Sequence, residues 1–198
     1  GRVVAMPAMP RALLPPVLTG DPSWVRIATR ELAWTGQARQ GLRGPVAHRV
    51  NEWLWLAGHL RTVTNVYSAA TTRGVSQFQQ ANHLPVTGVV DAATFAALSA
   101  PMAAAGARLV IPAGTPLGAA SVLAARQHIA ARPREVGGPN AGPWVRSYMG
   151  GLEGARWAWC AGFVGALVRQ AALALGRPMP FEWDRGVPSI GRHAADAR

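Results

Sequence analysis

Lysine is absent from this chain of 198 residues, and all 20 of its basic residues are arginine. Cysteine occurs only once, which excludes an intrachain disulfide and a cysteine-rich metal site. The five histidines are scattered and form no His-x-x-x-His pair, so we expect neither a metal nor a cofactor. No apolar run is long enough to cross a bilayer, and no signal-peptide pattern is visible at the start of the chain.

The formal net charge is +11, and hydrophobic residues make up 49% of the chain, which is enough for a substantial core. The arginines are spread singly along the sequence and are not clustered. Such a surface is either simply solvated or attracts an anionic polymer, which is nucleic acid or the bacterial wall. Because no nucleic-acid-binding motif is present, we favour the wall as the partner.

Residues 41–100 have the pattern of a compact three-helix domain. Apolar residues at helical spacing predict one helix around residues 46–57 and a second around residues 71–78. Asp91 then caps a third, short helix that carries Phe95 and Leu98. A bundle of this length is close to the lower limit for an independent hydrophobic core.

This region resembles the peptidoglycan-binding domain type 1 family. The sequence LPVTGVVDAATFAAL at residues 84–98 is similar to the C-terminal half of the family pattern, and TTRGVSQFQ at residues 71–79 to its middle. The family's Asp-Gly-x-Phe-Gly turn is replaced by TNVYS at residues 64–68, where Asn65 tolerates left-handed geometry. The resemblance implies peptidoglycan binding, with Tyr67 as a substrate-binding candidate. The alternative is a scaffold that kept the core and lost the ligand.

The single cysteine, Cys160, lies in the sequence WCAGFV at residues 159–164. The apolar residues that follow recur at helical spacing, which predicts a helix from about Trp159 to Leu175 with Cys160 facing inward from its first turn. Unpaired backbone N–H groups and the helix dipole stabilise a thiolate at such a position. The alternative is a small buried cysteine that only packs in the core.

Residues 121–198 resemble the start of a CHAP-type or NlpC/P60-type cell-wall hydrolase domain. The resemblance rests on EVGGPNAGPWVRSY at residues 135–148 followed by WCAGFV. It implies a papain-like fold in which Cys160 attacks a wall amide. The residues proposed to shape the cleft and bind substrate are Asn140, Trp157 and Trp159, and packing is the alternative role for both tryptophans.

A cysteine hydrolase also needs a histidine as its general base. His128 precedes the cysteine, on a helix expected at residues 121–131, and His193 follows it, whereas the family's base lies on a later strand. Too few residues follow Leu175 for the sheet of such a fold. We therefore expect the natural chain to continue past Arg198 or another subunit to cover the apolar helix, and we expect little hydrolysis by this chain.

The predicted fold class is mainly α: a three-helix peptidoglycan-binding-like bundle and the helical half of a papain-like α+β domain. The chain is predicted to have four parts: a proline-rich arm with a helix starting at Asp21-Pro22 (1–40), the bundle (41–100), a linker (101–120) and the hydrolase-like part (121–198). Within the linker, residues 109–111 dock or pair as a short strand. The hydrolase-like part contains a long loop at 134–157.

The predicted function is a cysteine peptidoglycan amidase or peptidase that a wall-binding module targets to its substrate. The alternative is a non-catalytic wall-binding or structural component of a phage tail or secretion assembly, in which other subunits would be partners. Both functions imply an extracellular, periplasmic or virion-associated protein. Nucleic-acid binding through the arginines is the weakest hypothesis.

Overall fold

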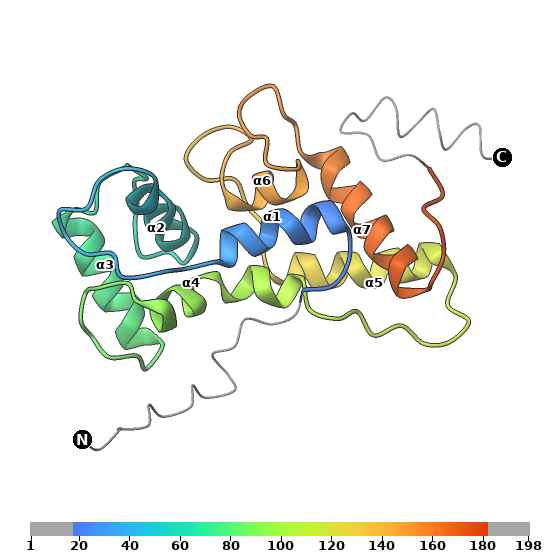
Figure 1. Ribbon diagram of the computed structural model, residues 1–198, viewed down its shortest axis with the longest axis horizontal. Helices are drawn as coiled ribbons and strands as arrows, with labels where there is room; N and C mark the ends of the chain where they lie inside the picture. Colours follow the sequence, from blue (N-terminus) through green and yellow to red (C-terminus); the bar gives the residue numbers. More distant parts are fainter. Residues whose placement is uncertain (1–17, 182–198) are drawn as a thin grey trace, which may run out of the picture.

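The structure, a computed structural model, describes residues 18–181, and this part of the chain is mainly helical, as the sequence predicts (Figure 1). Strand pairing within it is limited to two isolated bridges, Ala38 with Val90 and Arg43 with Val66. The proline-rich arm and His193 lie outside the described residues. The helices are α1 (Pro22–Leu32), α2 (Pro45–Leu56), α3 (Ala69–Ala81), α4 (Ala92–Ala105), α5 (Leu117–Ala130), α6 (Pro143–Tyr148) and α7 (Cys160–Ala174).

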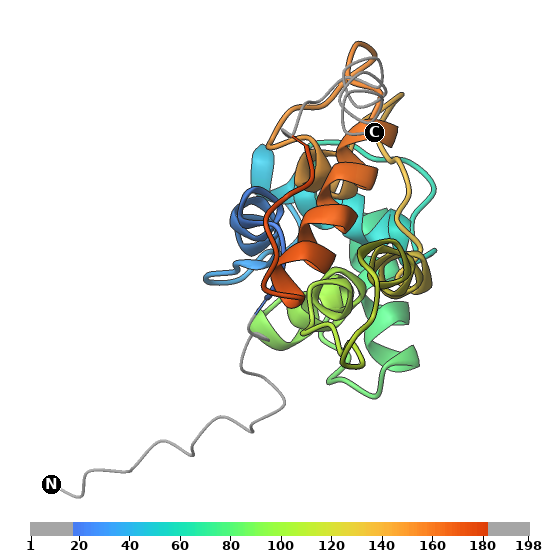
Figure 2. The same cartoon turned by 90° about the vertical axis from the view of Figure 1, so that its right-hand side faces the viewer.

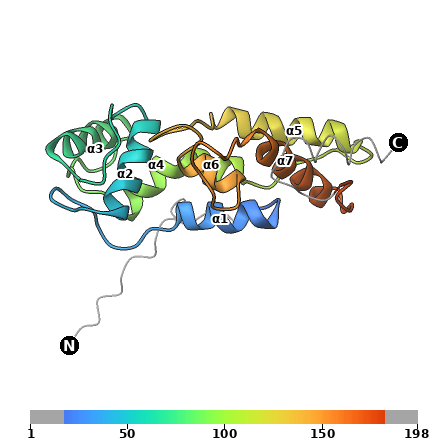
Figure 3. The same cartoon turned by 90° about the horizontal axis from the view of Figure 1, so that it is seen from above.

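The helices form an elongated body, with α2, α3 and the start of α4 at one end and α5 and α7 at the other (Figures 1 and 3). Helix α4 runs from the first group toward the middle, where α1 packs against both α4 and α6. Helices α5 and α7 pack against each other, and α7 crosses α5 at an angle in the view from that end (Figure 2). One hydrophobic core extends from the α2–α4 bundle to Trp144, Tyr148 and Ala166 in the second half.

Helix α1 begins as its sequence predicts. The carboxylate of Asp21 accepts a hydrogen bond from the backbone N–H of Ser23 at 3.1 Å, and Pro22 occupies the first helical position. The buried face of the helix carries Trp24, whose ring packs where Gly106 ends α4. A Cβ atom at Gly106 would lie 2.7 Å from that ring, so glycine permits the close approach of the two helices.

The α2–α4 bundle keeps a complete core, with Val50, Trp53, Leu54, Val75 and Phe95 all buried. In the turn before α3, the backbone of Asn65 does not take the left-handed geometry that we expected. The turn is held instead by the fully buried side chain of Asn51. Its amide nitrogen donates to the carbonyl oxygens of Thr64 (2.8 Å) and Val66 (2.9 Å), and its oxygen accepts from the hydroxyl of Thr71 (2.9 Å).

The segment predicted as a linker at residues 101–120 is largely helical. Helix α4 continues through Pro101 to Ala105, because Met102 and Ala105 are buried in the core and this packing outweighs the missing proline N–H. Helix α5 starts at Leu117, four residues before the start expected at residue 121. Between the two helices, Leu109 docks beside Ala124 and Leu167, as one of the two expected alternatives, and forms no strand.

Helix α7 is not left with an uncovered apolar face in the described structure. Its buried side chains include Ala166, Leu167 and Ala171, and it packs against α5. Only Val164 and Leu173 remain exposed among its large apolar residues, at 44% and 49% of their surface. The loop predicted before it also contains the short helix α6, whose side chains are mostly buried.

Candidate functional site

Cys160 is the first residue of α7, as the sequence predicts, but its side chain is exposed and does not face inward. The reading of Cys160 as a buried core residue is therefore wrong as well. The buried face of α7 starts one position later, at Ala161, while Leu167 and Ala171 are buried as the helical spacing predicts. No described residue forms a hydrogen bond with the thiol.

The two tryptophans before Cys160 are half-buried. The ring of Trp159 stacks on Tyr148 with 5.7 Å between centroids and meets the edge of Phe163 at 6.0 Å, while its indole N–H donates to the Glu135 carboxylate at 2.9 Å. The backbone N–H of Trp157 donates to the carbonyl oxygen of Gly154. These contacts give Trp159 a packing role, and its predicted contact with substrate stays a prediction.

Asn140 lies in the same loop and closes it through its backbone. Its φ angle is 49°, in the left-handed region that asparagine tolerates, and its carbonyl oxygen accepts a hydrogen bond from the N–H of Gly154 at 2.7 Å. The structure therefore brings Asn140, Trp157 and Trp159 to the region where α7 begins. It gives each of them a structural contact there.

His128 is the predicted base that lies within the described residues, and it does not touch Cys160. The ring is 1% exposed; Nδ1 lies 2.7 Å from the hydroxyl of Tyr148, and Nε2 lies 2.9 Å from the side-chain oxygen of Gln170. The amide oxygen only accepts, so Nε2 carries the proton and Nδ1 accepts from Tyr148. Burial lowers the pKa of His128 to about 4, although the hydrogen bond with Gln170 raises it. Both nitrogens are occupied, and the ring is a structural element.

Tyr67, the remaining predicted site residue, lies in the α2–α4 bundle, apart from the Cys160 region in sequence and in the fold. Its side chain is fully buried, and its hydroxyl donates a hydrogen bond to the carbonyl oxygen of Gly88 at 2.7 Å. Burial also raises the pKa of Tyr67 well above its ordinary value. Contact with a substrate would require this ring to leave the core, so we assign it to packing.

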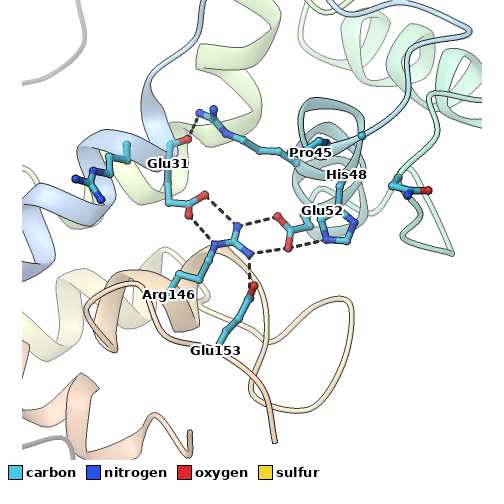
Figure 4. A pocket seen from close by; sticks show the side chains of 10 residues that line it. Glu31, Pro45, His48, Glu52, Arg146 and Glu153 are labelled. Atoms are coloured by element: carbon cyan, nitrogen blue, oxygen red, sulfur yellow. Dashed lines mark hydrogen bonds and ion pairs between the residues drawn. The ribbon is translucent and has the colours of Figure 1, made fainter.

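A cavity of about 590 Å³ lies where α1, α2 and α6 meet, and a cluster of charges lines it (Figure 4). Arg146 stands at its centre and makes ion pairs with Glu31 at 2.7 Å, Glu52 at 2.8 Å and Glu153 at 2.9 Å. Beside it, Arg49 donates to the backbone carbonyl oxygens of Glu31 and Ala33. The cavity therefore holds three carboxylates that already share one guanidinium.

Three arginines and three glutamates line this cavity, so its formal charges balance. Burial alone would lower the pKa of Arg146, but the hydrogen bonds with Glu52 and Glu31 raise it above its ordinary value. His48 adds a contact of 3.4 Å to Glu52. Sequence reasoning missed the cluster, because two of the three pairs of Arg146 are separated by 115 and 94 residues and no local pattern connects them. We read the cluster as a structural joint between helices.

A second cavity, of about 510 Å³, lies within the α2–α4 bundle, between the loop after α2 and the first half of α3. We call it the module cleft. Eight of its 12 lining residues are polar or charged, and none carries a carboxylate. The residues of the module cleft are Gly58, His59, Leu60, Arg61, Thr62, Thr64, Ser68, Ala70, Thr71, Arg73, Gly74 and Gln77.

Comparison with known protein families confirms the resemblance found in the bundle. Residues 43–98, which include α2, α3 and the first half of α4, match the family model described as a putative peptidoglycan binding domain. No curated protein and no solved structure matches the chain. The resemblance of residues 121–198 to a CHAP or NlpC/P60 domain receives no support. Within the described residues, no helix has the length and apolar character needed to cross a membrane.

Proposed function

We propose that this protein binds the peptidoglycan of the bacterial wall through residues 43–98 and acts without catalysis, as a wall-binding or structural component. The observation that carries the proposal is the match of these residues to a peptidoglycan-binding family, on a bundle whose core is complete. The helices outside the match share that core. They therefore hold the module in a fixed orientation, which suits a component that joins the wall to an extracellular, periplasmic or virion-associated assembly.

The geometry around Cys160 favours this function over hydrolysis. Nucleophilic catalysis needs a base within hydrogen-bond reach of the thiol. Within residues 18–181, Cys160 has no such partner, and both nitrogens of His128 bind other side chains. The charged cavity around Arg146 supplies no nucleophile of its own.

Sedimentation of the full chain with purified peptidoglycan sacculi tests wall binding. The net charge of +11 alone would produce some adsorption to any polyanion, and salt would screen it. Heparin-agarose therefore serves as the matched control matrix. We expect the chain to remain on sacculi at a salt concentration that releases it from heparin. Equal loss from both matrices would show that only its charge is recognised, and would contradict the proposal.

The second candidate function is a cysteine peptidoglycan hydrolase, and the exposed thiol at the start of α7 favours it. Mass spectrometry of fragments released from sacculi distinguishes the two functions. We expect no release by the chain, and we expect Cys160→Ser to bind sacculi as the unchanged chain does. Release of new amide-cleavage ends, abolished by Cys160→Ser, would establish the hydrolase instead.

A further inference from the structure

We propose that the module cleft is the ligand site of the wall-binding module and that Arg61 and Arg73 bind a free carboxylate of a peptidoglycan stem peptide there. The inference rests on the proposed wall-binding function and adds to it the location of the site and the chemical group that it recognises. Both arginines line the module cleft, and both are exposed.

The walls of the module cleft are fixed by close packing. Gly74 on α3 lies directly under the loop, because a Cβ atom at this position would collide with the carbonyl oxygen of His59 and lie 2.9 Å from Leu54. Asn51 holds Thr64 and Thr71 on either side of the cleft through hydrogen bonds of 2.8 and 2.9 Å. The backbone frame of the cleft is therefore preorganised, which lowers the entropic cost of binding a ligand.

The charge of the module cleft is unbalanced. Residues 43–98 contain only two acidic side chains, Glu52 and Asp91. Glu52 is 2% exposed and paired with Arg146, and Asp91 caps α4 by accepting the N–H of Thr94 at 2.8 Å. Neither acid lines the module cleft, so no carboxylate of the module neutralises the guanidinium groups there.

Three other arginines in contact with the bundle already have partners, whereas Arg43 is exposed on the bundle but does not line the module cleft. Arg49 and Arg134 donate to backbone carbonyl oxygens, at 2.6 Å from Arg49 to Glu31 and 2.7 Å from Arg134 to Leu56, and Arg146 pairs with glutamates. Within the described part of the chain, Arg61 and Arg73 take part in no ion pair and no side-chain hydrogen bond. Their donors are available to a ligand.

The lining residues indicate the class of ligand. A guanidinium binds a carboxylate through two parallel hydrogen bonds, and the nearby hydroxyl of Thr62 and amide of Gln77 can bind peptide groups beside it. Gln77 lies four residues after Arg73, so the two side chains lie on the same face of α3. A short peptide that carries a free carboxylate fits this arrangement, and the stem peptide is the part of peptidoglycan with that chemistry.

The experiment measures the affinity of full-length variants for sacculi by sedimentation. We expect Arg61→Gln with Arg73→Gln to weaken binding about ten-fold or more, since each charge-assisted hydrogen bond that is lost costs roughly that factor. The matched control is Arg26→Gln with Arg39→Gln. This variant also loses two positive charges, but from exposed positions outside the cleft, and it should bind like the unchanged chain. Circular dichroism should show the same fold in both variants.

Chemically modified sacculi identify the group that is bound. Amidation of stem-peptide carboxylates should lower the affinity of the unchanged chain for sacculi to that of the Arg61→Gln, Arg73→Gln variant. Removal of phosphate polymers should leave this affinity unchanged. Equal affinity of the cleft and control variants would overturn this inference while leaving wall binding intact. Sensitivity to phosphate removal in place of amidation would also overturn it. If the unchanged chain fails to sediment, the proposed function itself fails.

Discussion

Individual polar side chains in the interior are held by specific partners. His128 bridges α6 and α7 by its contacts with Tyr148 and Gln170, and its ring also meets the edge of Trp24 with 5.1 Å between centroids. Burial raises the pKa of Tyr148, so its hydroxyl stays protonated and able to donate to the neutral imidazole. Protonation of His128 would place a charge among these rings and break the hydrogen bond from Tyr148.

This arrangement predicts a dependence of stability on pH. The pKa of His128 is about 4 in the folded protein and 6.5 in the unfolded chain, so the unfolded chain binds more protons between these values. The contribution of His128 is therefore complete above about pH 6.5 and is lost as the pH falls toward 4, by about 3 kcal/mol in the free energy of unfolding. Denaturant titrations at several pH values measure this loss.

The matched control for this prediction is His83→Gln, at an exposed histidine. Its stability should keep the pH dependence of the unchanged chain, whereas His128→Gln should flatten the curve between pH 4 and 6.5. Burial also raises the pKa of Asp21, which has the opposite effect on stability, but both variants retain this group, so it cancels in the comparison. Equal slopes in the two variants would contradict the buried neutral state of His128.

At the scale of secondary structure, helices with local signals could be predicted and those without could not. Asp21-Pro22 marked the start of α1, and apolar spacing marked the helices of the bundle and the start of α7. Helix α6 was missed because its six residues lie inside a glycine-rich loop. The continuation of α4 past Pro101 depends on the burial of Met102, which only the tertiary structure reveals.

The module cleft could be predicted only in part. Family motifs at residues 71–79 and 84–98 predict the location of the bundle, but the predicted substrate-binding residue in the altered turn, Tyr67, is a core residue. Arg61 and Arg73 belong to a loop and a helix that meet only in the folded bundle. One available signal was that residues 43–98 contain only two acidic side chains.

The close contact between the loop after α2 and α3 predicts an unusual effect of alanine. Inside a helix, Gly→Ala normally stabilises by about 1 kcal/mol. At Gly74 we expect the sign to reverse, because the added methyl group would collide with the backbone of His59. Gly118→Ala in α5, where nothing lies within 4 Å, is the control and should be neutral or stabilising. Thermal unfolding measures both, and a stabilised Gly74→Ala protein would contradict the packing that forms the cleft.

At the scale of the whole molecule, the bundle that matches the family is part of a larger body. The module residue Glu52 pairs with Arg146 of α6, and the ring of Phe95 stacks on Trp34 with 4.4 Å between centroids. An isolated fragment of residues 41–98 would lose both contacts and leave a buried carboxylate without its partner. Wall binding is therefore best measured on the whole chain.

The cluster around Arg146 predicts a large effect of a single substitution. Arg146→Met removes the shared partner of Glu31 and Glu52, so we expect the free energy of unfolding to fall by about 3 kcal/mol, as for other broken buried pairs. Arg156→Met, at an exposed arginine in the loop that follows α6, is the control and should change little. Urea titrations give both values. Similar small losses in the two variants would mean that the cluster does not join the halves of the molecule.

The central claim is that the bundle, through the module cleft, recognises peptidoglycan. Its most direct test is a titration of the ¹⁵N-labelled full chain with a soluble muramyl tetrapeptide, followed through backbone amide shifts in NMR spectra. We predict that the perturbed amides lie in residues 58–64 and the first half of α3, with those around Cys160 unchanged. Perturbations centred on Cys160 and Trp159, or none at a saturating concentration of peptide, would contradict the account.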